Sequence, residues 1–178
     1  MNLQFRTALP EDLGAIRRLN HSAFAAELGQ HQTTEDGLLA DAREGVSRYF
    51  VAVYAGRVVG MVCASFERPF SVESRLEDAA ILEALPARVC EVRLLTIERE
   101  HRNTLVIAGL LTCMFRDIVR AGAACLVISG VTTRVPMYER MGFRALGPAV
   151  PQGNAAFVPM VLRLADLPPQ IRRGIERF

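Results

Sequence analysis

The sequence offers little that would bind a metal, a membrane surface or a nucleic acid. Its 3 histidines and 4 cysteines form no cluster at the spacing of metal ligands, so we expect no metal site. The cysteines stand apart inside apolar segments, which predicts reduced thiols in the core. A net charge of +2 is too small to predict a nucleic acid or an anionic membrane as a partner.

Signals for secretion or membrane insertion are also lacking. No apolar run reaches the ~20 residues needed to cross a bilayer, so no membrane span is expected. Residues 1–13 do not show the basic-then-apolar order of a secretory signal. We therefore expect a cytoplasmic protein.

What the chain does have is a large apolar content. Of its 178 residues, 51% are hydrophobic and 22% are charged, which is enough to bury one full core. We find no internal repeat, low-complexity segment or linker. The sequence therefore predicts a single domain over residues 1–178.

The stretch 90–122 reads as a strand, a polar turn and one long helix. Apolar residues occur on both faces of the strand, which is typical of a central strand, and alternation puts Glu91 and Arg93 on one face. Asn103 or Thr104 can cap the helix that follows. Because helix N-termini bind anions, this stretch predicts a place for a phosphate-bearing donor, with Glu91 as the candidate base.

The other elements follow from hydrophobic periodicity and turn residues. A hairpin turn at 55–57 predicts two antiparallel strands, and the continuous apolar run at 124–129 predicts another buried strand. The predicted strands are residues 3–7, 49–54, 58–65, 90–97, 124–129, 143–150 and 157–164. The predicted helices are residues 10–24, 76–85, 105–119, 135–141 and 167–178. This order predicts a mixed α/β fold with a central sheet of about six to seven strands flanked by helices.

Three motifs resemble the GNAT superfamily of N-acyltransferases. They are R-T-A-L-P-E-D-L at 6–13, E-V-R-L-L-T-I-E-R-E-H-R at 91–102 and M-Y-E-R-M-G-F at 137–143. The resemblance extends over residues 6–164 and implies the GNAT fold, with acyl transfer from a thioester to an amine. Acetyltransferases of this superfamily grip the pyrophosphate of coenzyme A with an Arg-x-x-Gly-x-Gly turn, whereas residues 102–107 have neither glycine.

A narrower resemblance accounts for the missing glycines. The chain looks like acyl-homoserine lactone synthases and long-chain N-acyl amino acid synthases. The matching positions are residues 27–29, 36–37, Asp41, Glu44, 49–52 and 91–94. Members of that branch commonly take a fatty acyl group from acyl carrier protein, whose 4′-phosphopantetheine ends in a single phosphate, so a pyrophosphate cradle is needed less. The chain is also similar to GNAT-like domains fused to class V aminotransferases, a resemblance that implies no particular acyl chemistry.

The chemistry of amide formation and the GNAT resemblance together indicate candidate catalytic residues. The reaction needs a base for the amine, donors for the oxyanion and an acid for the leaving thiolate. Glu91 matches the acidic position of the synthases and is our candidate base, directly or through water; alternatively, it is a structural carboxylate paired with Arg93. Arg93 would orient Glu91 or bind an acceptor carboxylate. Tyr138 matches the GNAT tyrosine that protonates the thiolate, or is a phenol packed at the sheet edge.

Five further residues are candidates for binding the donor. The backbone amides of Leu95 and Ile97 would pair with pantetheine like an added strand, as the resemblance implies. Arg102 would meet the phosphate together with the helix start at Asn103 and Thr104. The alternative for Arg102 is a solvated loop arginine.

Four residues are weaker candidates. Ser129 ends its strand on the side where open α/β sheets bind ligands, so it is a candidate for holding donor or acceptor, with a turn serine as the alternative. Asp41, Glu44 and Arg68 are candidates for shaping the acceptor pocket, or are solvated charges.

These residues favour an N-acyltransferase that moves an acyl group longer than acetyl from acyl carrier protein or acyl-CoA to the amine of an amino acid or related small molecule. Two alternatives stay open. One is a GNAT-fold module that binds a ligand or a partner without catalysis, which the missing glycines favour. The other is a conventional N-acetyltransferase that uses acetyl-CoA, with a peptide amine as a further acceptor. The sequence carries no prediction of the oligomeric state.

Overall fold

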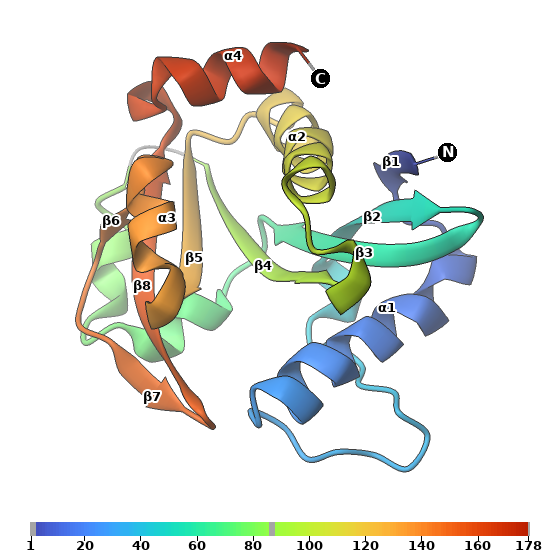
Figure 1. Cartoon of the computed structure of the whole chain (residues 1–178). Coiled ribbons are helices and arrows are strands. Elements are labelled where there is room, and N and C mark those ends of the chain that lie inside the picture. Colours follow the sequence, from blue (N-terminus) through green and yellow to red (C-terminus); the bar gives the residue numbers. More distant parts are fainter. Residues whose placement is uncertain (1–2, 86–87, 178) are drawn as a thin grey trace. The chain divides into compact units, whose positions relative to one another are not determined.

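The chain divides into two compact units, and Figure 1 shows its elements coloured along the sequence. The computed structural model describes residues 3–85 and 88–177. Unit 1 comprises Met1–Ala64 and Leu94–Arg116, and unit 2 comprises Ser65–Arg93 and Asp117–Phe178. The chain passes between the units at the end of strand β3 (Arg57–Ser65), inside strand β4 (Val89–Ile97) and inside helix α2 (Thr104–Arg120). A single domain over residues 1–178 stays a prediction.

Unit 1 is built on antiparallel strands. Strand β1 (Leu3–Thr7) pairs with β2 (Arg48–Tyr54), and β2 pairs with β3. A tight turn at Ala55 and Gly56 joins β2 to β3, and both residues have positive φ (49° and 79°), as a two-residue hairpin turn requires. In the strand order, β3 is followed by β4. The predicted hairpin is therefore confirmed.

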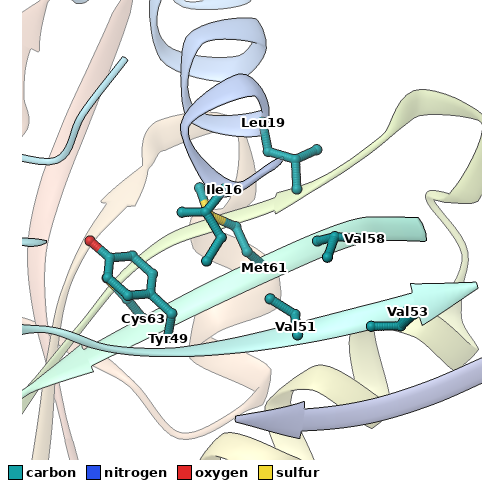
Figure 2. Close-up of a cluster of buried hydrophobic side chains, with 8 residues drawn as sticks. All are labelled: Ile16, Leu19, Tyr49, Val51, Val53, Val58, Met61 and Cys63. Atoms are coloured by element: carbon teal, nitrogen blue, oxygen red, sulfur yellow. The ribbon is translucent and has the colours of Figure 1, made fainter. Parts of the chain in front are cut away.

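Helix α1 (Leu13–Asn20) packs on a core of unit 1, which Figure 2 shows in close-up. Ile16 and Leu19 are the buried apolar residues that the helix contributes. The strand residues of this cluster are Tyr49, Val51, Val53, Val58, Met61 and Cys63. A 3-10 turn (Pro10–Asp12) precedes α1, and a π-helical segment (His21–Glu27) follows it.

A buried carboxylate fixes the start of α1. Asp12 accepts hydrogen bonds from the Arg6 guanidinium at 2.6 and 3.1 Å and from the backbone N–H of Leu9 at 2.7 Å. The Arg6 hydrogen bond holds the pKa of Asp12 below its ordinary value, although burial acts in the opposite direction. This pair ties β1 to the first turn of the helix.

Unit 2 contains the first part of β4 and four further strands. β4 runs parallel to β5 (Cys125–Val131), with pairs from Val89↔Cys125 to Glu91↔Val127. β5 pairs antiparallel with β8 (Ala155–Arg163), which also pairs with β6 (Arg144–Ala145) and β7 (Val150–Gln152). Helix α3 (Val135–Arg140) follows β5, and helix α4 (Pro169–Arg177) follows β8. The core of this unit contains Phe70, Val72, Leu82, Cys125, Val127 and Val161.

Within residues 3–85 and 88–177, the sheet has eight strands, one or two more than predicted. The predicted strand 143–150 is divided into β6 and β7. Gly147 and Pro148 lie between them, and a proline has no N–H to donate to a ladder. The other predicted strands are confirmed with shifts of up to two residues at their ends.

The predicted helix 76–85 is wrong. Leu76 is extended (φ −95°, ψ 139°), and two short 3-10 turns, Ser71–Arg75 and Ala79–Leu82, occupy this part of the chain. The Asp78 side chain starts the second turn by accepting a backbone N–H, a local bond that competes with a longer helix. Over the described residues, no helix combines the length and the apolar character needed to cross a membrane.

Strand β4 has an irregular backbone at Leu94. Its φ of +55° lies in the left-handed region, which a residue other than glycine seldom adopts. Neighbouring residues are buried on both sides of Leu94, Cys90 with Glu91 and Thr96 with Ile97, as expected of a strand whose two faces are covered. The sequence analysis did not foresee this break in the backbone, while Glu91 and Arg93, which precede it, do lie together as predicted.

All four cysteines are free thiols. Cys63, Cys90 and Cys125 are buried and Cys113 is partly buried. This confirms the predicted core thiols for the first three. Burial raises the pKa of the Cys125 thiol, so it stays protonated at neutral pH.

Candidate active site

Glu91 is a buried carboxylate of β4, within unit 2. Its side chain is 1% exposed, and both oxygens accept a backbone N–H, from Ser71 at 2.9 Å and from Val72 at 2.7 Å. The Nε of Arg93 lies 3.6 Å from Oε2 of Glu91. A buried carboxylate needs such donors, because its transfer from water is otherwise costly. The structure thus brings the two predicted residues together and adds the 3-10 turn Ser71–Arg75 as their support.

Ser71 contacts three charged side chains through three different atoms. Its N–H donates to Glu91, its Oγ accepts from Nη1 of Arg93 at 3.0 Å, and its carbonyl oxygen accepts from Nη1 of Arg75 at 3.4 Å. Arg75 also donates to the Oε1 of Gln152, and its guanidinium lies over the Phe157 ring, 5.2 Å from the centroid. Burial lowers the pKa of Arg75, and the charge of Glu91 opposes that shift.

Tyr138 of α3 packs against the backbone of β5, also within unit 2. A Cβ placed on Gly130 would lie 2.9 Å from two atoms of the tyrosine ring, so glycine is what allows this close approach. The ring also meets Phe143 edge to face, with centroids 6.1 Å apart. Burial raises the pKa of Tyr138, with Arg134 acting in the opposite direction. The phenol is therefore protonated at neutral pH.

Ser129 immediately precedes Gly130 in β5. Its Oγ is buried and has no hydrogen-bond partner among the described residues. A buried hydroxyl without a partner is costly. Ser129 therefore keeps a donor and an acceptor available beside the strand position that Tyr138 covers.

The predicted donor-binding residues lie in unit 1, around the start of α2. Arg102 donates to both carboxylate oxygens of Glu27 at 2.8 and 3.0 Å and to the carbonyl oxygen of Ile97 at 2.8 Å. Asn103 caps the helix, since its Oδ1 accepts the N–H of Val106 at 3.0 Å. The structure thus groups these predicted residues, and Arg102 is an exposed side chain that is ion-paired with Glu27.

The remaining two predicted donor residues differ in exposure. Thr104 is the first residue of α2 and is exposed. On β4, the Leu95 side chain is 36% exposed, whereas Ile97 is 6% exposed. Leu95 is therefore the most accessible side chain of the strand beyond Leu94.

The three charges proposed to shape an acceptor pocket all have protein partners. Asp41 accepts the Tyr49 hydroxyl at 2.7 Å, and Glu44 accepts two hydrogen bonds from Arg17 at 3.1 and 2.6 Å. Arg68 binds Glu73 at 2.9 and 3.1 Å. In the part of the chain that the structure describes, no group of three or more His, Cys, Asp or Glu is arranged to hold a metal ion.

A family model described as N-acyl amino acid synthase FeeM matches residues 15–166. The chain belongs to this family. As a FeeM-family member it is an N-acyltransferase of the GNAT superfamily, and it transfers an acyl group to an amine. The predicted superfamily, enzyme class and reaction class are confirmed.

Solved structures share the FeeM-family fold of this chain. BjaI, a CoA-dependent acyl-homoserine lactone synthase solved with SAM and isopentyl-CoA, has a TM-score of 0.79 at 18% identity, over 99% of this chain and 89% of BjaI. FeeM, an N-acyl amino acid synthase from uncultured soil microbes, has a TM-score of 0.72 at 16% identity, over 93% of this chain and 94% of FeeM. A putative N-acetyltransferase from Lactobacillus plantarum has a TM-score of 0.65 at 18% identity, over 92% and 97% of the two chains. These likenesses confirm the predicted GNAT fold. Among curated proteins, none matches this sequence.

Two parts of this candidate site were missed by the sequence analysis. The turn that holds Glu91 was not foreseen, although an acid inside an apolar strand is a signal that donors must lie nearby. Arg75 gave no signal of its own, because its place depends on that turn. The Glu27 partner of Arg102 lies 75 residues away in sequence and was identified only as part of a motif.

Proposed function

We propose that the chain joins an acyl chain longer than acetyl to the amine of an amino acid, and that it takes the acyl group from the thioester of acyl carrier protein or of coenzyme A. The observation that carries the finer proposal is the start of α2, where Ile107 and the 56% exposed Leu105 stand at the two glycine positions of the turn. Side chains at these positions limit how closely a pyrophosphate approaches the backbone. This start of α2 therefore favours the single phosphate of phosphopantetheine.

In unit 1, we assign the donor phosphate to Arg102 and to the capped start of α2 at Asn103 and Thr104. The ion pair of Arg102 with Glu27 is exposed, with side-chain exposures of 41% and 34%, and such pairs contribute only about 0–1 kcal/mol. A phosphate with two negative charges replaces the Glu27 carboxylate at little cost. The backbone amides of Leu95 and Ile97 are assigned to the amides of pantetheine, as an added strand.

In unit 2, Glu91 takes the proton of the attacking amine, directly or through one water. Each carboxylate oxygen has a second lone pair beyond the one that accepts a backbone N–H, so the group is fixed in place and can still accept a proton. Arg93 orients it. The amine nitrogen attacks the thioester carbon, the C–S bond breaks, and the phenol of Tyr138 donates its proton to the thiolate. The phenol of Tyr138 holds its proton at neutral pH, as a general acid must before the thiolate leaves. Ser129, with its available hydroxyl, is assigned to holding the donor.

The proposal is tested by offering the purified protein three donors with a pool of amino acids and detecting new amides by mass spectrometry. The donors are acetyl-CoA, a long-chain acyl-CoA and acyl carrier protein charged with a fatty acyl group. We expect amides from the long-chain donors and little from acetyl-CoA. Product from acetyl-CoA alone would point to a conventional acetyltransferase, and no product from any donor would point to a binding module.

A further inference from the structure

Arg75 is a half-buried arginine whose contacts are all with uncharged groups. It donates to the carbonyl oxygen of Ser71 and to the amide oxygen of Gln152, and it stacks on Phe157. Its Nε is buried without a hydrogen-bond partner, and no carboxylate among the described residues forms an ion pair with it. Burying a guanidinium without an opposite charge is unfavourable.

Glu91, the acid whose charge acts on Arg75, forms no ion pair with it among the described residues. Glu91 already accepts two backbone N–H groups and lies 3.6 Å from Arg93, so Arg75 feels its charge only at longer range. The other acid of the supporting turn, Glu73, binds Arg68 and the backbone of Phe70. Among the described residues, Arg75 therefore lacks an anionic partner.

The geometry leaves donors for such a group. A guanidinium has five N–H donors in one plane, and the two hydrogen bonds of Arg75 use two of them. Phe157 covers a face of the plane and leaves the edge for hydrogen bonds. A carboxylate binds two parallel N–H groups of such an edge, which is the strongest form of this contact.

We infer that Arg75 binds the carboxylate of the acceptor, so that the substrate is a free amino acid and not a simple amine or a peptide amine held by its interior residues. This inference rests on the proposed function and adds a specificity-determining residue to it. Because Ser71 contacts Arg75, Arg93 and Glu91, the carboxylate subsite and the candidate base share one support. The alternative is an arginine that only links the turn 71–75 to β7 and β8.

The test compares acceptors that differ only in the carboxylate. L-leucine is paired with isoamylamine and L-phenylalanine with phenethylamine, and the rate of amide formation is measured for the wild type and Arg75→Gln. We expect the variant to lower kcat/KM for both amino acids about 30- to 100-fold and to change it for the two amines less than about threefold. Arg88→Gln is the matched control, because Arg88 also stacks on an aromatic ring of unit 2 (Phe66, 4.7 Å from the ring centroid). This variant should change kcat/KM for neither the amino acids nor the amines.

Two results overturn the inference. One is an equal loss for amino acids and amines in Arg75→Gln, which indicates a structural role. The other is a wild type that acylates each amine as well as its amino acid.

A binding measurement separates this inference from the proposed function. Calorimetric titration of the same four acceptors, without donor, should show binding of the amino acids that Arg75→Gln abolishes. If no acceptor is acylated yet this carboxylate-dependent binding is present, the proposed function fails and the inference stands. If acylation occurs and neither rate nor binding depends on the carboxylate, the inference alone fails.

Discussion

Replacing Glu91 by glutamine keeps the shape of the side chain and removes its charge. Both carboxylate oxygens accept a backbone N–H, at 2.9 and 2.7 Å, in a site that is 1% exposed. Glutamine has only one oxygen, so its NH₂ group faces the second N–H and that donor loses its partner. A hydrogen bond to a charged acceptor is worth about 1.5–3 kcal/mol, and Arg93 loses the charge beside it as well. We therefore expect the free energy of unfolding to fall by about 2–4 kcal/mol.

The same variant tests the base. A positioned general base contributes about 10²–10⁴-fold to the rate, so kcat should fall by about 100-fold or more in Glu91→Gln. The assay is amide formation by mass spectrometry, at a temperature where a melting curve shows the variant to be folded. Binding of acyl-CoA, followed by calorimetry, should be unchanged, because Glu91 is assigned to the attacking amine and to no contact with the donor.

Glu73→Gln is the matched control for this prediction. Glu73 also accepts a backbone N–H, from Phe70 at 2.7 Å, and also binds an arginine, Arg68. Its replacement should lower the free energy of unfolding by a similar amount while kcat per folded molecule changes less than about threefold. If both variants lower kcat equally, Glu91 is a structural carboxylate and the reasoning is refuted.

Three further predictions concern packing, pH and the phenol. Gly109→Ala should destabilise the protein by about 1–3 kcal/mol in chemical denaturation, because its Cβ would lie 2.1 Å from the Phe5 ring; in a Phe5→Leu background the same change should be neutral or stabilising. Asp12→Asn should cost about 2 kcal/mol at pH 7. The pKa of Asp12 is lowered beside Arg6, so this stabilisation is complete above the ordinary aspartate pKa and is lost as the pH falls through the lower pKa of the folded state. An equal difference in the free energy of unfolding between wild type and variant at pH 7 and pH 2 would contradict this prediction. Tyr138→Phe should lower kcat by about 10- to 100-fold with little change in Tm. Because burial raises the pKa of Tyr138, the wild-type kcat should show no loss from phenol ionisation up to about pH 9. Equal rates for variant and wild type would exclude the phenol as the acid.

The sequence predicts the elements of this fold well where hydrophobic period, length and turn residues agree. Residues 3–7 coincide with β1, and Asn103 caps α2 as its residue type and place predict. The same pattern says nothing of Leu94, because leucine has no preference for the left-handed backbone that it adopts. That conformation is imposed by the surrounding fold and not by the local sequence.

The candidate site was predictable to the extent that it is local. Glu91 and Arg93 are two residues apart on one strand, so their contact follows from strand geometry. The contacts of Glu91 with Ser71 and Val72 join positions 20 and 19 residues apart, and they depend on a 3-10 turn in a stretch where we predicted a helix further along. The sequence analysis predicted no element over residues 71–75, so it identified neither the residues that hold the acid nor Arg75.

Ser71 contacts Glu91, Arg93 and Arg75, and this has a consequence for comparing related sequences. Two of its three contacts are made by main-chain atoms, which every amino acid other than proline supplies, and only the hydroxyl contact with Arg93 requires serine. Position 71 can therefore change between related proteins while the hydrogen bonds to Glu91 and Arg75 are kept. Low conservation at position 71, or a mild effect of Ser71→Ala, would therefore underestimate how many contacts of the charged side chains depend on this residue.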